Sequence, residues 1–348
     1  MRIGVVGLGS MGNRRIRDLG REGHEFVVWD QNSRRIEDCI DRHSFQLEAA
    51  ESPEALFGGG VDVAVISTPP DTHIDYLEAC YEHVVPFFCE AGILRPPVDW
   101  FEERERNSGV RGYPSGTWYF HPLYRYLGER LAQMREDGHQ INTFRYHFAS
   151  FLPLWHPGEN PNDFYAGRLK TGAGREMVAF EGNALLVMMG RPKRVVAYHS
   201  HRSRLDFEAH DSYHLMVEMD GGERGELTID LHDRLPVREG RVSTSSGTFV
   251  FDVAADATVT FSDVESGKTE VTHPGERRLL CGLDLEKVYR DEIVTFARSV
   301  EFGEPYPKGW TEECALSDLV VAAERSAKEE KWVSLEEVVY SYDWSSEV

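Results

Sequence analysis

The feature that most constrains this chain is a glycine-rich turn near its start. Residues 7–12 read G-L-G-S-M-G and fit the pattern G-x-G-x-x-G. The turn follows an apolar run at 2–6 that predicts a strand, and it opens a helical pattern over 10–22. Such a turn lets phosphate groups approach the backbone at a helix N-terminus. We therefore expect a Rossmann-type dinucleotide site, with pyrophosphate contacts from Gly7, Gly9, Ser10, Met11 and Gly12.

An acidic residue, Asp30, directly follows the second predicted strand at 25–29. A carboxylate in this place accepts hydrogen bonds from the adenosine ribose and repels a 2′-phosphate. The sequence therefore favours NAD as the cofactor. Arg34 and Arg35 follow closely, so NADP stays possible. The alternative interpretation is a glycine turn with an exposed Asp and no ligand.

Alternation of short apolar runs with helical patterns continues through residue 120. Further strands are predicted at 61–66 and 84–88, with helices at 33–41 and 71–83. This alternation is typical of parallel βαβ units. We expect an N-terminal Rossmann domain at 1–120.

The pattern changes after residue 121. A helix at 122–136 and a strand at 141–149 precede an irregular stretch at 150–174, a helix at 175–189, alternating runs over 193–272 and helices near 284–302 and 311–329. Alternating runs between turn signals predict an antiparallel sheet. The expected fold class is therefore α/β, with a C-terminal α+β domain at 121–348 that contains a large, mostly antiparallel sheet.

Composition excludes several partners. The formal net charge is −21, which repels nucleic acid and anionic membranes. No apolar run reaches membrane-spanning length, and we see no signal peptide, so we expect a cytoplasmic protein. The five cysteines are odd in number and widely spaced, which favours neither disulfides nor a zinc cluster.

Two histidine pairs invite a metal interpretation, namely His199 with His201 and His210 with His214. Neither has a nearby carboxylate or cysteine pattern that would complete a site. We interpret them as surface or sheet-packing histidines and expect no metal.

Several further segments resemble the Gfo/Idh/MocA family, named for glucose–fructose oxidoreductase and inositol dehydrogenase. The segments that carry the resemblance are V-A-V-I-S-T-P-P at 63–70 with His73, F-H-P at 120–122, L-P-L-W-H-P at 152–157, and Tyr289 with Glu292 and Phe296. Their order matches over nearly the whole chain. The resemblance implies a nicotinamide cofactor and reversible oxidation of a sugar or cyclitol hydroxyl. It also implies a homodimer or homotetramer that packs through the open sheet, and we expect one face of that sheet to be apolar.

The resemblance also implies further cofactor contacts. In the family, the segment after the strand at 61–66 lies along the nicotinamide half of the cofactor, and an E-K-P segment follows the next strand. The residues that fall on these segments are Ser67, Thr68, Pro69, His73, Glu90 and Ala91.

The chain departs from the family at both usual proton-transfer positions. Ala91 stands where the lysine of E-K-P is expected, and the position of the usual histidine falls on Phe180 or Glu181. Oxidation of an alcohol still needs a base. Our candidates for catalysis are Glu181, Lys170, Glu176 and His121. Our candidates for substrate binding are Glu90, Arg175, His156 and Tyr165.

Each candidate also has a purely structural interpretation. Glu176 and Arg175 suit the first turn of a helix, and Glu181 suits an internal ion pair. The leading function is an NAD(P)-dependent oxidoreductase acting on a small molecule, a sugar, amino sugar or polyol. The alternatives are a glycoside-cleaving enzyme that uses NAD, and a dinucleotide-binding regulatory protein without catalysis.

Overall fold

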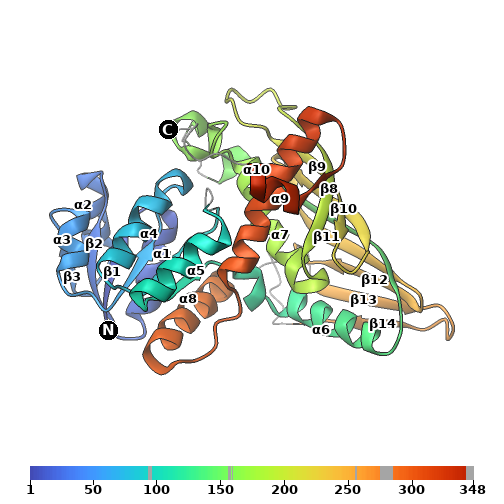
Figure 1. The fold of residues 1–348 in the computed structure, drawn as a ribbon, viewed down its shortest axis with the longest axis horizontal. Coiled ribbons are helices and arrows are strands. Elements are labelled where there is room, and N and C mark those ends of the chain that lie inside the picture. The colour runs from blue at the N-terminus through green and yellow to red at the C-terminus, as the bar shows by residue number, and fades with distance from the viewer. Residues whose placement is uncertain (93–95, 156–157, 159, 255–256, 275–284, 342–348) are drawn as a thin grey trace. The chain divides into compact units, whose positions relative to one another are not determined.

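The computed structural model describes residues 1–348 except 93–95, 156–157, 159, 255–256, 275–284 and 342–348 (Figure 1). The chain forms two compact units. The first contains residues 1–117 and 286–314, and the second contains 118–285 and 315–348.

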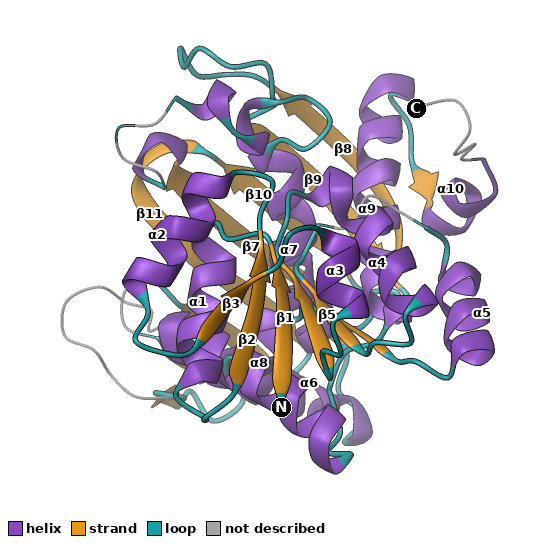
Figure 2. Ribbon diagram, turned by 90° about the vertical axis from the view of Figure 1, so that its left-hand side faces the viewer, coloured by secondary structure: helices purple, strands orange, loops and turns teal. Residues whose placement is uncertain are grey.

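The first unit contains a six-stranded sheet in the order β3-β2-β1-β4-β5-β6, and each neighbouring pair is parallel. Figure 2 shows β3, β2 and β1 side by side in this order. The strands are β1 (Arg2–Val6), β2 (Glu25–Trp29), β3 (Leu47–Ala49), β4 (Val63–Ile66), β5 (Phe87–Cys89) and β6 (Gly112–Pro114). The helices of residues 1–117 are α1 (Ser10–Gly20), α2 (Ser33–Arg42), α3 (Pro53–Gly58), α4 (His73–Glu82) and α5 (Val98–Ser108).

The strand order reverses direction between β1 and β4, which are neighbours in the sheet but not in the sequence. Every residue of β4 is buried, as expected for a parallel strand covered on both faces. In an open parallel sheet, ligands bind beyond the carboxyl ends of the strands at such a reversal. The turns after β1 and β4 lie at this point. The predicted Rossmann sheet is confirmed, and the ligand site beyond these turns stays a prediction.

The first unit also includes residues 286–314, which differs from the expected division at residue 120. The helix α8 (Leu285–Phe302) brings Phe296 against Phe88 of β5, with ring centroids 5.5 Å apart. Trp310 stacks on Phe101 of α5 at 3.9 Å. This segment therefore completes the apolar core of the unit, although it follows in sequence after the second sheet.

The second unit contains a nine-stranded sheet in the order β14-β13-β12-β11-β7-β10-β9-β8-β15. The pair β10–β7 is parallel and the other pairs are antiparallel, so the predicted mostly antiparallel sheet is confirmed. The strands are β7 (Ile141–Phe151), β8 (Pro192–Ser200), β9 (Ser212–Met219), β10 (Arg224–Asp230), β11 (His232–Thr244), β12 (Gly247–Asp252), β13 (Thr258–Asp263), β14 (Thr269–Thr272) and β15 (Val333–Ser334).

Helices cover the inner face of this sheet. They are α6 (Pro122–Glu136), α7 (Ala173–Met189), most of α9 (Trp310–Glu329) and α10 (Leu335–Ser341). Residues 150–172, expected to be irregular, contain short 3₁₀ turns at Leu152–Leu154, Pro161–Asp163 and Tyr165–Gly167. The buried residues of α7 pack against the inner side of the sheet, and this packing places its first turn beside the loop at 165–172.

The outer face of the nine-stranded sheet is not uniformly apolar, and this corrects our expectation. Met216 and Val250 are exposed there, but Arg145 and Glu226 lie between them in register and form an ion pair at 3.4 Å. Charged side chains therefore occupy the centre of the face that we expected to be apolar. Self-association through this sheet stays a prediction.

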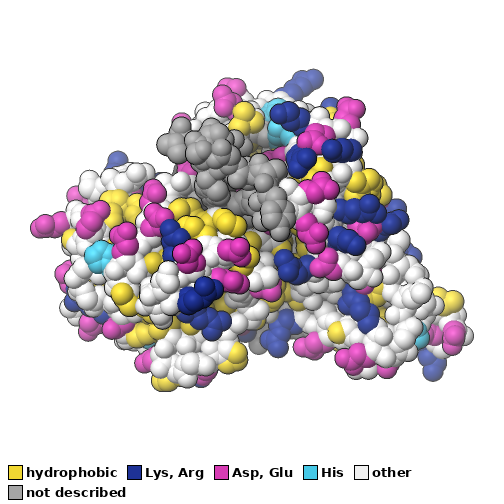
Figure 3. Space-filling view, viewed as in Figure 1, with side chains coloured by type: hydrophobic (Ala, Val, Ile, Leu, Met, Phe, Trp, Pro, Cys, Tyr) yellow, Lys and Arg dark blue, Asp and Glu magenta, His cyan; other side chains and the backbone are white. Residues whose placement is uncertain are grey.

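Acidic side chains are scattered over the surface in view in Figure 3 and are interspersed with arginines and lysines. Among the described residues, no helix combines the length and the apolar character that crossing a membrane requires.

Candidate functional site

The glycine turn after β1 has the backbone geometry that its motif predicts. Gly7 has a φ of 90°, and a Cβ on it would lie 2.5 Å from the carbonyl oxygen of Ser67. A Cβ on Gly12 would lie 1.9 Å from the carbonyl oxygen of Gly7. Both positions therefore require glycine, one for conformation and contact and the other for close packing of α1 against the turn.

Gly9 differs from the other two glycines because a Cβ there would meet no atom within 4 Å. Open space therefore lies directly over the backbone at the start of α1. Among the described residues, no side chain caps this helix, and its first turn carries no acidic residue. Free N–H groups and the positive end of the helix dipole thus face that space, which suits a pyrophosphate.

Asp30, directly after β2, is almost fully buried. Its carboxylate accepts hydrogen bonds from the backbone N–H of Leu8 at 2.7 Å and of Asn32 at 2.9 Å. Arg35 lies 3.8 Å away, which is a weak pairing. An ionised carboxylate offers about four acceptor positions. Asp30 can therefore hold the glycine turn and still accept from ribose hydroxyls.

The turn after β4 is fixed by His73, which is completely buried. Burial lowers the pKa of His73 to about 4, so the ring is neutral at physiological pH. Its Nε2 lies 2.9 Å from the carbonyl oxygen of Thr68, to which a neutral ring donates. Thr68 Oγ1 is itself buried and has no hydrogen-bond partner among the described residues. This hydroxyl and the open space at Gly9 both fit a bound dinucleotide, which would supply the missing partner.

Glu90 follows β5 and belongs to a buried ionic cluster that the sequence interpretation missed. Arg15 of α1 is fully buried and donates to Glu90 at 2.7 Å and to Glu292 of α8 at 2.7 Å. Burial by itself lowers the pKa of Arg15, but the charges of the two glutamates outweigh burial and raise the pKa above its usual value. Ser67 Oγ also contacts Glu90 at 3.4 Å. Glu90 is thus held in place beside the turn after β4.

In the second unit, Glu181 lies on α7 and is fully buried. Its Oε1 accepts from Arg238 Nη2 at 2.8 Å, and its Oε2 accepts from the hydroxyl of Tyr146 at 2.5 Å. Both oxygens are therefore occupied by internal donors. Glu181 does not fit the expected role of proton acceptor, because it is fully buried and a base must have an acceptor atom within reach of the substrate hydroxyl.

The ion pair of Glu181 continues into a buried hydrogen-bonded chain. Tyr124 contacts Tyr146 at 2.5 Å between their hydroxyl oxygens. Burial and the charge of Glu181 raise the pKa of Tyr124 and of Tyr146, so both keep their protons. Burial alone lowers the pKa of Arg238, but Glu181 and the two tyrosines raise it overall. The chain therefore consists of an arginine cation, a carboxylate and two neutral phenols.

His121 caps the start of α6, where its Nδ1 accepts from the backbone N–H of Leu123 at 3.3 Å. Burial, followed by the charge of Arg238, lowers the pKa of His121 to about 4. The ring is therefore neutral, and with Nδ1 engaged its proton resides on Nε2. His121 is arranged to donate a hydrogen bond rather than to act as a base.

The segment around the first turn of α7 holds three other candidates. Arg175 is paired with Glu324 at 2.8 Å and donates to the carbonyl oxygen of Lys170 at 3.0 Å, so its fork is partly occupied. Glu176 stands in the first turn of α7 and is partly exposed. The side chain of Lys170 itself is exposed. Lys170 is therefore the most accessible titratable group of this segment.

The remaining candidates for substrate binding are Tyr165 and His156. Tyr165 is partly buried, and its carbonyl oxygen accepts from Thr171 at 2.7 Å. His156 lies outside the described residues. Ala91, which replaces the expected lysine, is partly exposed and offers no titratable group.

The histidines considered for metal binding have partners of other kinds. The rings of His199 and His210 lie 4.3 Å apart, and His201 Nδ1 lies 3.0 Å from the carbonyl oxygen of Ala209. His214 contacts the hydroxyl of Ser212 at 3.1 Å. Within the described part of the chain, no group of three or more potential ligands has a geometry that could hold a metal ion.

Comparison with known proteins agrees with this geometry. Residues 1–102 match the Gfo/Idh/MocA family, described as an oxidoreductase family with an NAD-binding Rossmann fold. No curated protein matches the sequence. The N-terminal unit is therefore an NAD-binding domain, as the glycine turn and Asp30 predicted.

Solved structures show the same fold over nearly the whole chain. An oxidoreductase from Agrobacterium radiobacter in complex with NAD⁺, L-tartaric acid and magnesium has a TM-score of 0.79 at 13% identity, covering 97% of this chain and 99% of that one. A putative myo-inositol dehydrogenase from Sinorhizobium meliloti has a TM-score of 0.73 at 18% identity, covering 96% and 99%. A levoglucosan dehydrogenase in complex with NADH and levoglucosan has a TM-score of 0.77 at 14% identity, covering 96% and 98%.

Proposed function

We propose that this chain, whose residues 1–102 match the Gfo/Idh/MocA model of NAD-binding oxidoreductases, transfers a hydride between a nicotinamide dinucleotide and a sugar, amino sugar or polyol. In the oxidative direction, a C–H bond of the substrate breaks and its electron pair passes to the nicotinamide as hydride. The hydroxyl proton passes to a base, and a carbonyl group forms. The observation that carries the proposal is the open helix N-terminus at Gly9 beside the buried carboxylate of Asp30.

The substrate class is supported by two proteins of the same fold, whose names are putative myo-inositol dehydrogenase and levoglucosan dehydrogenase. Both names denote oxidation of a polyhydroxylated ring. The experiment is to screen cyclitols, sugars and amino sugars for NADH formation. Net NADH in proportion to the product supports a dehydrogenase. Product without net NADH would instead support glycoside cleavage through transient oxidation.

We propose that Asp30 makes NAD the preferred cofactor. Its charge repels a 2′-phosphate, and its free acceptor positions suit the ribose hydroxyls. Asp30→Asn should weaken NAD binding about tenfold and narrow the preference over NADP, because hydrogen bonds to charged groups contribute about 1.5–3 kcal/mol. Calorimetric titration with each cofactor measures this. Asparagine has one acceptor oxygen where Asp30 uses both, Oδ2 for Leu8 and Oδ1 for Asn32, so the variant should also unfold at a lower temperature, and the titrations are run where circular dichroism shows it to be folded. Tighter binding of NADP by the unchanged protein would contradict the proposal.

We propose that Lys170 accepts the hydroxyl proton. Glu181 is occupied by Arg238, His121 has its proton on the outer nitrogen, and Lys170 is exposed beside the glycine-rich start of α7. Lys170→Met should therefore reduce kcat by about 10²–10⁴-fold and leave NAD affinity unchanged.

A matched control for Lys170 is Lys193→Met, which removes an exposed lysine at the start of β8. This variant should keep normal turnover on the substrate identified by the screen. If Lys170→Met raised KM and left kcat intact, Lys170 would bind the substrate rather than transfer its proton. Glu176 would then be the next candidate for the base.

We also propose that this protein is a cytoplasmic enzyme, and that it acts on a small molecule as a homodimer or homotetramer. The four described cysteines are buried thiols, and a reducing compartment suits them.

A further inference from the structure

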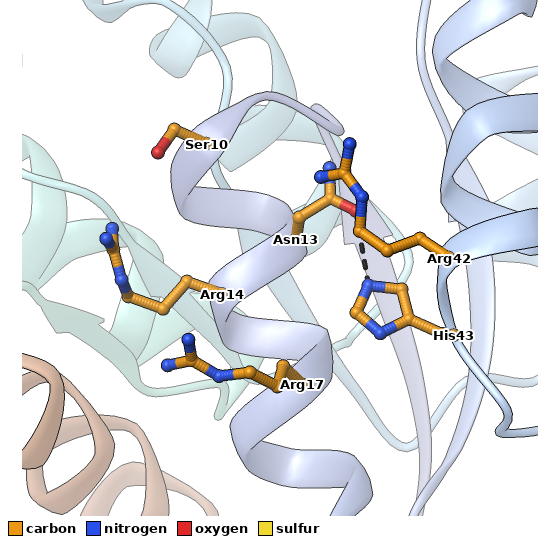
Figure 4. A pocket seen from close by; sticks show the side chains of 6 residues that line it. All are labelled: Ser10, Asn13, Arg14, Arg17, Arg42 and His43. Carbon is orange, nitrogen blue, oxygen red and sulfur yellow. Dashed lines mark hydrogen bonds between the residues drawn. The ribbon is translucent and has the colours of Figure 1, made fainter. Parts of the chain in front are cut away.

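A cavity of about 280 Å³ lies on the first unit beside helix α1. Its lining residues are Ser10, Asn13, Arg14, Arg17, Arg42 and His43 (Figure 4). The first four come from α1, and the last two come from the end of α2. In Figure 4, Arg14 and Arg17 leave α1 on one side, while Arg42 and His43 stand beside Asn13 on the other. All six residues belong to the first unit.

The charge of this cavity is opposite to that of the chain, whose net charge is −21. Arg14 and Arg17 both pair with Glu286 of α8, at 2.9 and 2.5 Å, and Arg17 also pairs with Asp18 at 2.8 Å. Arg42 is exposed and has no ion-pair partner among the described residues. The side of the cavity formed by Arg42 and His43 therefore has positive charge without a neutralising carboxylate.

Asn13 fixes the tautomer of His43. Its amide nitrogen donates to the carbonyl oxygens of Leu8 and Gly9 at 2.7 and 3.0 Å. Its Oδ1 therefore faces His43 Nε2, 3.2 Å away, and accepts from it. With Nε2 protonated, the remaining lone pair of the ring is on Nδ1. His43 can become a cationic donor by taking a second proton at that atom.

The surroundings of His43 oppose this second proton in the absence of an anion. Burial lowers the pKa of His43, and the charges of Arg42 and Arg17 lower it further. Arg17 acts from α1, and Arg42 acts from the end of α2. A dianion bound beside Arg42 and His43 would offset these positive charges and favour protonation of Nδ1.

We propose that this cavity binds an anion of the phosphate class, either free or as the phosphate group of a small metabolite. The guanidinium fork of Arg42 matches phosphate geometry, and His43 beside it adds a further donor when the anion is present. The cavity is largely open to solvent, so the organic part of a phosphate monoester could extend out of it. The site adjoins the pyrophosphate contacts expected above Gly9, because Ser10 belongs to both and Asn13 connects them through the carbonyl oxygens of Leu8 and Gly9.

The first test uses sulfate, which stays a dianion throughout the range in which histidine titrates. Calorimetry at constant ionic strength should show one sulfate per chain. The affinity should rise as the pH falls from 8, and the gain should approach tenfold only below the pKa of His43 in the free protein, because a rise of about one unit in that pKa has this reciprocal effect. NMR of the His43 ring should show that rise directly when sulfate is added. An unchanged His43 titration would overturn the proposal.

The second test compares two arginines. Arg42→Met should weaken sulfate binding about tenfold, because a charge-assisted contact is lost. The matched control, Arg21→Met, removes the same charge from the end of α1, where Arg21 lies 3.7 Å from Asp18. It should change the affinity less than about twofold. Equal weakening in both variants would mean general attraction only and would overturn the proposal.

The third test separates the cavity from the cofactor site and identifies the source of the anion. Sulfate should still bind when NAD saturates the protein, and loss of binding would assign the anion to the pyrophosphate contacts instead. Glucose 6-phosphate and inorganic phosphate are then compared. Tighter binding of the sugar phosphate indicates a phosphorylated metabolite, and equal or weaker binding indicates the free anion.

Discussion

Glu181→Gln should lower the free energy of unfolding by about 3–5 kcal/mol, because it leaves a buried arginine without its counter-ion. Arg238 is buried against Trp118 and Phe148, with its guanidinium 4.7 and 4.6 Å from their ring centroids. Water therefore cannot replace the carboxylate. Glutamine keeps the size of the side chain and an acceptor for Tyr146, so the expected loss comes from charge. Denaturation by urea, followed by circular dichroism, measures the difference.

The matched control is Glu226→Gln. Glu226 lies on the solvent-exposed outer face of the nine-stranded sheet that also contains Arg238, and it pairs there with Arg145 at 3.4 Å. It should cost less than about 1 kcal/mol. A second variant, Glu181→Leu with Arg238→Met, removes both charges and should recover most of the loss. If Glu181→Gln were as stable as the unchanged protein but inactive, the original assignment of Glu181 as the base would be restored.

The difference between the expected and observed role of Glu181 shows where sequence interpretation reaches its limit. The glycine turn was predictable because its determinants lie within six neighbouring residues and impose local geometry. Asp30 was predictable because it follows a strand at the spacing of the motif. The partner of Glu181, in contrast, lies 57 residues away on another element, and no local pattern indicates it.

The structural elements that the sequence analysis missed are short or polar. Strands β3 and β6 have three residues each, and α5 reads V-D-W-F-E-E-R-E-R-N-S with a single buried residue, Phe101. Such segments have little apolar periodicity to detect. The outer face of the large sheet was misjudged for a related reason. Alternation predicts which residues share a face, but it does not predict that Arg145 and Glu226 would be neighbours across strands.

The buried position of Arg15 is the missed feature that the sequence itself could have indicated. It lies on α1 next to Ile16, which is also fully buried, and an arginine on the apolar face of a helix needs a buried partner. Two acidic residues that the family resemblance had already marked, Glu90 and Glu292, prove to be those partners. The two motifs therefore have a structural role in common, which neither motif shows alone.

Arg15→Met should accordingly lower the free energy of unfolding by at least about 3–5 kcal/mol, because two carboxylates lose their common cation. Glu292 keeps hydrogen bonds from Ser115 at 2.9 Å and from the backbone N–H of Gly116 at 2.7 Å. Glu90 keeps only the long contact with Ser67 at 3.4 Å among its described partners, so it should move first. The matched control, Arg14→Met, removes the neighbouring arginine, whose partner Glu286 is half-exposed, and should cost less than about 1 kcal/mol.

Acidification provides a second measurement on the same pair of variants. In Arg15→Met no cation balances the two buried carboxylates, and acid removes their negative charges. The loss in the free energy of unfolding caused by Arg15→Met should therefore become smaller as the pH falls. The small loss in the free energy of unfolding caused by Arg14→Met should not depend on pH in this way. NAD affinity should also fall in Arg15→Met, since Glu90 and Ser67 lie together beside the turn after β4. A deficit that stayed constant with pH would mean that packing, rather than charge, is what Arg15 contributes.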